Sequence, residues 1–232
     1  MTKPSGGTFA LVGGGEWGDH CRDLDAELVA ISGAEEVLVL PTATAFEHPE
    51  RVAARATAYF QSLGVEARTL EVLHRAEAED AQVAKEVRGA KFLYLVDGSP
   101  LHLRSVLKDS ALFDALLAVY HGGGVLVASG AGATVLCDPM VDPRGGAYTV
   151  GLGVVRDLAV FPYHGTAADH LRERSIDLLP KAATLVGIDE ETALVRAVDG
   201  TWTARGAGAV TVYAATEAAA YRDGVAVPGL PT

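Results

Sequence analysis

Short apolar runs alternate with longer amphipathic stretches along most of this chain. Runs rich in β-branched and other apolar residues predict strands, and apolar residues at helical spacing predict helices. The strands are expected at residues 9–12, 36–40, 66–70, 92–96, 125–129, 159–161, 184–188, 193–198 and 209–213. The helices are expected at residues 19–31, 49–63, 78–87, 101–108, 112–120 and 167–179.

The order of these elements predicts the fold class. Up to residue 129 strands and helices alternate, as is typical of a mostly parallel sheet with helices on both faces. Later strands follow one another closely around the Asp199-Gly200 turn signal, so we expect a hairpin added to that sheet. We therefore predict an α/β fold, a three-layer α/β/α sandwich. Residues 1–232 are expected to form a single domain, because no repeat, linker or low-complexity block interrupts the pattern.

Composition and charge argue against some classes of binding partner. Hydrophobic residues make up 49% of the 232 residues, which is enough for a packed core. The net charge of −11 argues against a nucleic-acid partner, which would need a basic face. No apolar run reaches the length of a membrane span, and the first residues do not resemble a signal peptide. Cys21 and Cys137 lack disulfide-framework spacing, so we expect reduced thiols in a cytoplasmic protein. Because no apolar run could span a membrane, we expect no membrane partner.

Glycine-bearing turns follow three predicted parallel strands, at residues 13–15, 97–100 and 130–132. The ligand crevice of an open α/β sheet lies at the carboxyl ends of its strands, so the three turns are expected to share one crevice. Residues 13–15 lack the G-x-G-x-x-G frame, and no P-loop lysine follows them. A plain tight turn is favoured there over a nucleotide site, and we expect no cofactor.

The third turn resembles a nucleophile elbow. Residues 127–133 read V-A-S-G-A-G-A, in the strand–turn–helix context where G-x-S-x-G hydrolases hold a serine. Here Gly130 stands at the nucleophile position and Ser129 comes one residue early. Glycine adopts strained elbow dihedrals without a Cβ clash, which relieves about 1–3 kcal/mol. The elbow geometry is therefore expected to persist without its hydroxyl.

The second turn, D-G-S-P at residues 97–100, opens a predicted helix. Its backbone N–H groups would point at the crevice, as an oxyanion hole requires. Alternatively, Ser99 caps the helix and Pro100 takes its first position. The two interpretations are compatible, because capping does not involve the Gly98 amide.

Two further strand ends carry titratable groups. Asp189, Glu190 and Glu191 follow the strand at 184–188 and form either a solvated turn or a carboxylate held near the crevice. His164 ends another strand and is a candidate base. His164, His170 and Asp169 suggest a metal site, but a zinc site needs more convergent ligands, so we expect no metal.

Taken together, these motifs resemble the peptidase S51 family, which includes dipeptidase E and cyanophycinase and has a class I glutamine amidotransferase-like fold. The resemblance extends along nearly the whole chain, and the chain resembles especially the bacterial branch of the family that carries the CDPM and DPRGG motifs after the elbow. The motifs are GGGE at 13–16, LPTAT at 40–44, DGSP at 97–100, the elbow, CDPM at 137–140, DPRGG at 142–146, GLG at 151–153, Pro162 and GIDEETA at 187–193.

The resemblance implies a site. Family members hydrolyse small acidic peptides with a Ser–His–Glu/Asp triad and no metal. It places their serine on Gly130, their histidine on Tyr163 with His164 displaced by one, and their acid on Glu190. Two of the three triad side chains are therefore lost.

The resemblance also implies where a ligand is held. The oxyanion donors would be the amides of Gly98 and Ala131. Ser99 beside them and Arg144 in the loop after the elbow are expected to contact the ligand as well.

These losses favour a protein that is not an ordinary serine peptidase. We expect it to bind or transform a small amino-acid- or peptide-like molecule in the retained crevice. The sequence is compatible with a monomer and with a homodimer. A repurposed enzyme would use Ser129 or Tyr163 with His164, His170 or Glu190 as acid or base. The alternative is an active S51-type dipeptidase using the shifted Ser129 and His164. A one-residue slip on a strand turns a side chain to the opposite face, which argues against that alternative.

Overall fold

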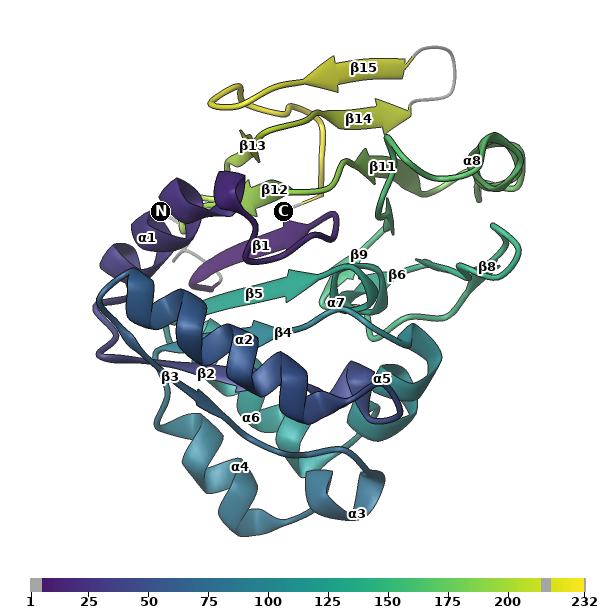
Figure 1. Cartoon of the computed structure of the whole chain (residues 1–232). Coiled ribbons are helices and arrows are strands. Elements are labelled where there is room, and N and C mark those ends of the chain that lie inside the picture. Colours follow the sequence, from purple (N-terminus) through teal and green to yellow (C-terminus); the bar gives the residue numbers. More distant parts are fainter. Residues whose placement is uncertain (1–5, 214–217, 232) are drawn as a thin grey trace.

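A seven-stranded sheet forms the centre of the computed structural model, which describes residues 6–213 and 218–231 (Figure 1). Its strands are β1 (Thr8–Val12), β2 (Glu36–Leu40), β3 (Glu66–Thr69), β4 (Phe92–Leu95), β5 (Val125–Ser129), β12 (Thr192–Arg196) and β13 (Trp202–Gly206). The order is β13-β12-β1-β5-β4-β2-β3. The five strands from β1 to β3 in this order pair in parallel, whereas β12 pairs antiparallel with β1 and β13. The predicted mostly parallel sheet is confirmed.

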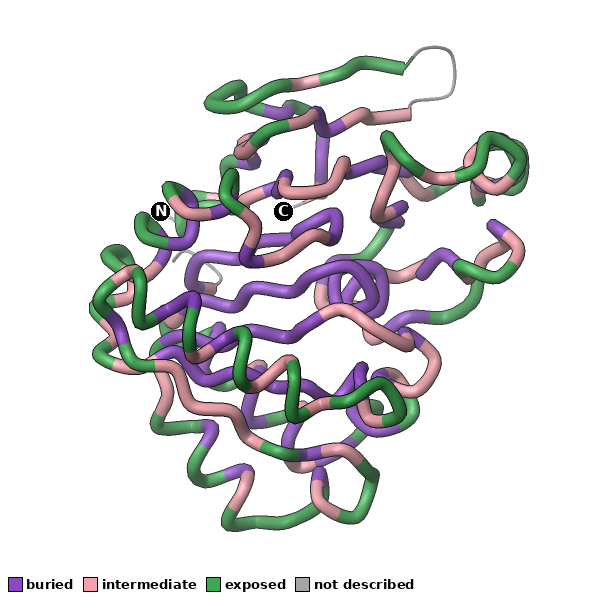
Figure 2. Tube along the Cα trace, viewed as in Figure 1, coloured by how far each residue is buried: buried purple, intermediate pink, exposed green. Residues whose placement is uncertain are grey.

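Helices cover both faces of this sheet, which completes the predicted α/β/α layering. Alternate residues of β1 show why: Ala10 and Val12 pack with α1 and α2, and Phe9 and Leu11 pack with the opposite layer. All four are buried, as a sheet covered on both faces requires. Figure 2 shows the buried strands between helices that expose their outer faces. The helices are α1 (Arg22–Ser32) and α2 (Pro49–Ser62) on one face, and α4 (Ala81–Arg88), α5 (Pro100–Leu107) and α6 (Ala111–His121) on the other.

A second, four-stranded sheet corrects one expectation. The predicted hairpin does extend the main sheet, as β12 and β13. However, the neighbouring strands form a sheet of their own, with the order β10-β11-β14-β15. The chain changes sheets at the short turn between β11 and β12, and a burial pattern cannot reveal that change because both of these strands are mostly buried. The strands are β10 (Leu158–Phe161), β11 (Thr184–Ile188), β14 (Val210–Tyr213) and β15 (Ala218–Tyr221), with α8 (Asp169–Asp177) between β10 and β11.

Short elements fill the loops around the carboxyl ends of the parallel strands. The helix expected at 78–87 starts later, at Ala81, because Asp80 accepts a hydrogen bond from the Gln82 amide (2.7 Å) and caps α4, and residue 78 ends the preceding helix. The loop after the elbow contains four two-residue strands. These elements are η1 (Asp19–Cys21), η2 (Thr42–Thr44), α3 (Arg75–Ala78), α7 (Ala131–Leu136), β6 (Cys137–Asp138), β7 (Met140–Val141), β8 (Tyr148–Thr149) and β9 (Val155–Arg156).

Candidate functional site

The turn between β5 and α7 has the backbone of a nucleophile elbow. Gly130 stands at the joint with φ 47° and ψ −105°, outside the regions that residues with a side chain prefer. Its amide donates to the carbonyl of Val12 at 2.9 Å, and its carbonyl accepts from the Thr134 amide at 3.1 Å. A strand that leads through a strained turn directly into a helix is the elbow arrangement. The turn therefore has elbow geometry with a glycine, Gly130, at its joint.

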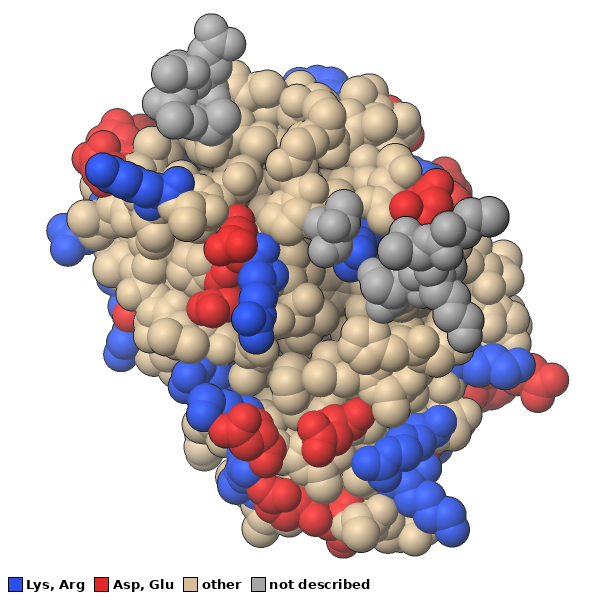
Figure 3. Space-filling view, turned by 180° about the vertical axis from the view of Figure 1, so that it is seen from behind, with Lys and Arg blue, Asp and Glu red and all other residues tan. Residues whose placement is uncertain are grey.

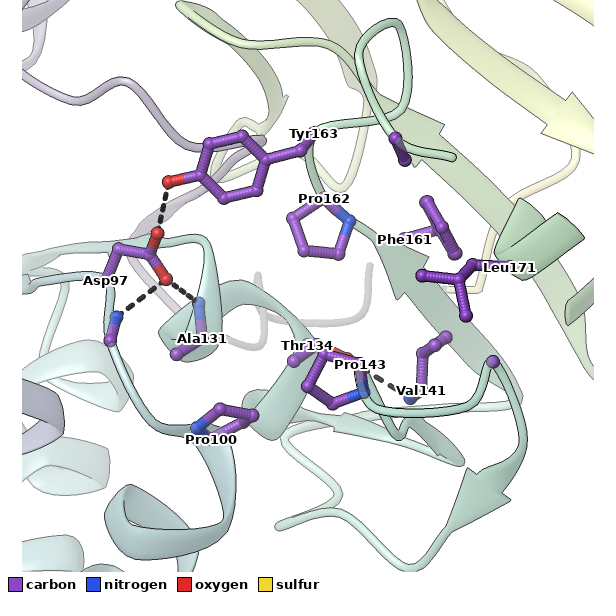
Figure 4. Close-up of a pocket in the computed structure, with 13 residues that line it drawn as sticks. Asp97, Pro100, Ala131, Thr134, Val141, Pro143, Phe161, Pro162, Tyr163 and Leu171 are labelled. Atoms are coloured by element: carbon purple, nitrogen blue, oxygen red, sulfur yellow. Dashed lines mark hydrogen bonds between the residues drawn. The ribbon is translucent and has the colours of Figure 1, made fainter. Parts of the chain in front are cut away.

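The carboxylate of Asp97 occupies the expected oxyanion hole. Asp97 Oδ1 accepts hydrogen bonds from the amide of Gly98 at 2.7 Å and from the amide of Ala131 at 2.6 Å (Figure 4). These are the two amides that the family resemblance implies as oxyanion donors. They converge on a single oxygen, and that oxygen belongs to the protein itself.

The same carboxylate fills the space above the elbow. A Cβ atom built on Gly130 would lie 2.1 Å from both Cγ and Oδ1 of Asp97. Atoms cannot approach so closely, so a side chain at position 130 and the present Asp97 conformation exclude each other. The glycine at position 130 therefore permits the observed conformation of Asp97.

Tyr163 completes the cradle around Asp97. Its phenol donates to Asp97 Oδ2, and its amide donates to the carbonyl of Gly13 at 2.7 Å. Its ring covers Gly14, where a Cβ would lie 2.3 Å from ring atom Cζ. Burial, reinforced by the negative charge of Asp97, raises the pKa of the phenol. Tyr163 therefore stays protonated and acts as a donor.

Ser129 points away from this cradle. It is fully buried, and its hydroxyl donates to Glu16 Oε2 at 2.7 Å. Side chains alternate along a strand, so Ser129 shares a face of β5 with Val127, which packs in the α1 and α2 layer. Burial raises the pKa of the Glu16 carboxyl; the hydrogen bond from Ser129 opposes this effect and the charge of Asp97 adds to it. The Ser129 hydroxyl is thus committed to a buried carboxyl.

His164 belongs to a separate network. Its Nδ1 lies 3.3 Å from Asp189 Oδ1, and its Nε2 lies 2.6 Å from the hydroxyl of Tyr213. Burial lowers the pKa of the imidazole, although Asp189 acts in the opposite direction. Because Ser129 bonds to Glu16 and His164 bonds to Asp189 and Tyr213, the structure does not bring the two shifted residues together.

A cavity of about 250 Å³ opens beside Asp97 and Tyr163. Figure 4 shows these two polar groups at one end and apolar side chains along the other walls. None of the described residues that line it is a Lys, Arg or His. The apolar walls include Pro100, Val141, Pro143, Phe161, Pro162 and Leu171.

The remaining expected site residues divide between the cavity and its surroundings. Gly98 and Ala131 line the cavity, whereas Ser99, Arg144 and Glu190 are not among its described lining residues. Ser99 caps α5, as the alternative interpretation proposed. The Arg144 guanidinium bonds to Asp142 and its side chain is 72% exposed. Glu190 accepts from the Thr166 hydroxyl at 2.8 Å.

Sequence reasoning missed Asp97 and Glu16 as site residues. Both stand in motifs that attracted attention for their glycines, GGGE and DGSP. The available signal was their position, since each follows a parallel strand within a few residues and so lies at the ligand edge of the sheet. That signal could not show that the Asp97 carboxylate reaches the amide after the elbow.

Three further observations concern metal sites, membrane spans and surface charge. Within residues 6–213 and 218–231, no group of three or more His, Cys, Asp or Glu side chains could hold a metal ion. In the same ranges no helix is both long and apolar enough to cross a membrane. On the face drawn in Figure 3, the visible Lys and Arg side chains are interleaved with Asp and Glu.

Comparisons with known proteins agree with the fold and the motifs. The family model for peptidase family S51 matches residues 9–202. The cyanophycinase of Trichormus variabilis is 26% identical over 223 residues, which cover 89% of this chain and 73% of the relative. The crystal structure of a peptidase from an acI-B1 Actinobacterium has a TM-score of 0.87 at 25% identity, covering 97% of this chain and 98% of that one.

A more distant solved structure shares the fold. It is a putative peptidase E protein from Listeria monocytogenes EGD-e, with a TM-score of 0.64 at 15% identity, covering 94% of this chain and 98% of that chain. The family model spans well over half of the present chain, which confirms the resemblance inferred from the motifs. The protein belongs to peptidase family S51.

Proposed function

We propose that this S51 family member binds a small amino-acid- or peptide-like molecule in the cavity beside Asp97, and that it does not hydrolyse peptides by the serine mechanism. The observation that carries this proposal is the Asp97 carboxylate on both oxyanion donors. Acyl transfer needs those donors for the developing oxyanion of the tetrahedral intermediate. A carboxylate already bound there takes the donors and repels a second negative charge.

The nucleophile and base positions support the same conclusion. Gly130 has no hydroxyl, and Tyr163 stands where the family resemblance implies histidine. Because burial raises the pKa of the Tyr163 phenol, it is a poor base near neutral pH. Loss of triad members lowers the rate by several orders of magnitude, so little hydrolysis is expected.

The alternative with Ser129 and His164 has less support. A general base must lie within hydrogen-bond reach of the proton that it abstracts, directly or through one water. The Ser129 hydroxyl donates to Glu16, and the His164 ring is held by Asp189 and Tyr213. Ordinary hydrolysis would require both networks to rearrange.

Transformation of the bound molecule is a second candidate, favoured by the hydrogen bond between Tyr163 and Asp97 at the cavity wall. In that case the protonated phenol would donate a proton and the carboxylate would accept one. Replacement of Tyr163 by Phe would then abolish turnover, whereas binding would be weakened but retained through Asp97.

The proposal is tested by two assays on the purified full chain. The first measures cleavage of Asp-X dipeptides and isoaspartyl peptides by the wild type and by Ser129→Ala. The second is a thermal-shift screen of amino acids, amino-acid amides and dipeptides. We expect no cleavage and a raised melting temperature with at least one compound. Cleavage that Ser129→Ala abolishes would overturn the proposal and support a re-registered serine hydrolase.

A matched pair of variants locates the binding. Ala167 lines the cavity, so Ala167→Phe should fill it and abolish the thermal shift. Ala54 lies exposed on α2, so Ala54→Phe makes the same change elsewhere and should leave the shift intact. A shift that survives Ala167→Phe would place the ligand outside this cavity.

A further inference from the structure

The cavity presents negative charge without a cationic side chain to balance it. Asp97 lies in its wall, and the described lining residues include no Lys, Arg or His. Glu16 lies near Asp97, and the charge of Asp97 contributes to the raised pKa of the Glu16 carboxyl. Arg55 approaches Glu16 at 3.7 Å, but its side chain is 58% exposed and it does not line the cavity. A carboxylate in mostly apolar surroundings favours a cationic ligand and disfavours an anionic one.

The hydrogen bonds of Asp97 leave an acceptor position on Oδ2 for a donor from the ligand. A carboxylate offers about four acceptor positions, two on each oxygen. The amides of Gly98 and Ala131 fill Oδ1, whereas Oδ2 accepts from Tyr163 alone among the hydrogen bonds of the described residues. The phenol oxygen donates its proton to Asp97 and can itself accept another hydrogen bond. Asp97 Oδ2 and the Tyr163 hydroxyl are therefore two neighbouring acceptors.

This pattern matches an ammonium group better than a guanidinium. An ammonium has three N–H donors and no acceptor, and these donors can reach Oδ2 and the phenol oxygen together. A guanidinium prefers to bind both oxygens of one carboxylate in a planar fork. That fork is not available, because Oδ1 already accepts two amide hydrogen bonds.

The walls opposite Asp97 and Tyr163 determine the polarity and the size of the remainder of the ligand. Phe161, Leu171, Val141 and Pro143 face the polar end across the cavity (Figure 4). A volume of about 250 Å³ is below the range of about 300–1,000 Å³ typical of sites for drug-sized ligands. An apolar group the size of one amino-acid side chain therefore suits it. A free carboxylate on the ligand would find no cationic side chain among the described lining residues.

We propose that the cavity recognises an α-amino compound without a free carboxylate, namely an amino-acid amide or a peptide amino terminus with an apolar side chain. The α-ammonium binds Asp97 Oδ2 and the Tyr163 hydroxyl, and the side chain packs against Phe161 and Leu171. This inference rests on the proposed function and names the class of ligand for the same cavity.

Isothermal titration calorimetry of the full chain at neutral pH tests this inference. The probes are leucinamide, N-acetyl-leucinamide without the charge, 4-methylpentanoate with the opposite charge, and the pair isopentylamine and isopentylguanidine. We expect leucinamide and isopentylamine to bind, and each of the other three to bind at least about tenfold more weakly. N-acetyl-leucinamide lacks the charged donor, 4-methylpentanoate adds a repulsion, and isopentylguanidine cannot pair its planar fork with both oxygens of Asp97. This comparison needs no variant.

The variant Asp97→Asn provides a second test, in which its affinity for leucinamide is compared with that of the wild type. The side-chain carbonyl oxygen of the introduced asparagine can still accept from the two amides while the charge is removed, and affinity for leucinamide should fall at least about tenfold. Asp169→Asn makes the same change on α8, where the side chain is 78% exposed, and should not alter binding.

The outcomes separate the two proposals. Equal binding of leucinamide and N-acetyl-leucinamide, or unchanged leucinamide binding in Asp97→Asn, would overturn the ammonium inference and leave the binding function standing. Binding of 4-methylpentanoate in preference to the amines would do the same. If no compound in the broader screen binds at all, the proposed function itself fails, and the inference fails with it.

Discussion

Replacement of Gly130 by Ala probes whether Asp97 occupies the nucleophile position. At φ 47° and ψ −105° a side chain adds backbone strain of about 1–3 kcal/mol in any background. In the wild type the new Cβ would also lie 2.1 Å from Asp97 Cγ, so the carboxylate must leave its cradle. Asp97 would then lose hydrogen bonds from Gly98, Ala131 and Tyr163.

The lost hydrogen bonds determine the size of the effect. A hydrogen bond to a charged group contributes about 1.5–3 kcal/mol, and displacement of Asp97 loses at least one. We therefore expect Gly130→Ala to lower the free energy of unfolding by about 2.5–6 kcal/mol in the wild type. In an Asp97→Ala background only the backbone strain remains, and the same change should cost about 1–3 kcal/mol.

Urea unfolding of the wild type, both single variants and the double variant measures the coupling free energy. Gly64→Ala is the control, because Gly64 also has a positive φ of 77° but its Cβ would have nothing within 4 Å. That change should not couple to Asp97. If Gly130→Ala costs the same in both backgrounds to within about 0.5 kcal/mol, Asp97 does not occupy the space above the elbow.

Two further predictions concern buried carboxyl groups. Ser129→Ala removes the hydroxyl that donates to Glu16 Oε2, so we expect a loss of about 1–3 kcal/mol in urea unfolding; an unchanged midpoint would contradict the proposed bond. For Asp25, which is 2% exposed and accepts from Tyr59 at 2.8 Å, burial raises the pKa to about 7. In the unfolded chain this group has a pKa of about 3.9, so its stabilising contribution is complete below about pH 4 and is lost as the pH rises through about 7. Urea unfolding across this window should show the wild type losing stability relative to Asp25→Asn as the pH rises, and a constant difference would refute the shift.

The main features of the fold could be predicted from the sequence alone. Apolar runs such as β1 and β5 are buried on both faces, as is typical of strands in a parallel sheet between two layers of helices. Their alternation with helical patterns implied a parallel sheet, and glycine-bearing turns at the ends of those strands implied one crevice. The elbow followed from a local motif, because backbone geometry near a glycine turn depends mostly on neighbouring residues, whereas the pair of amides at Gly98 and Ala131 was implied by the family resemblance.

Tertiary structure alone decided what fills that crevice. Asp97 and Gly130 are far apart in sequence, and their contact depends on β4 lying beside β5. The partners of Ser129 and His164, Glu16 for one and Asp189 and Tyr213 for the other, likewise come from distant segments. Local pattern records which face of a strand is apolar, but which polar atoms meet depends on strand order and loop paths. The sequence therefore determined the scaffold, and packing between distant segments decided that the Asp97 carboxylate fills the space above Gly130.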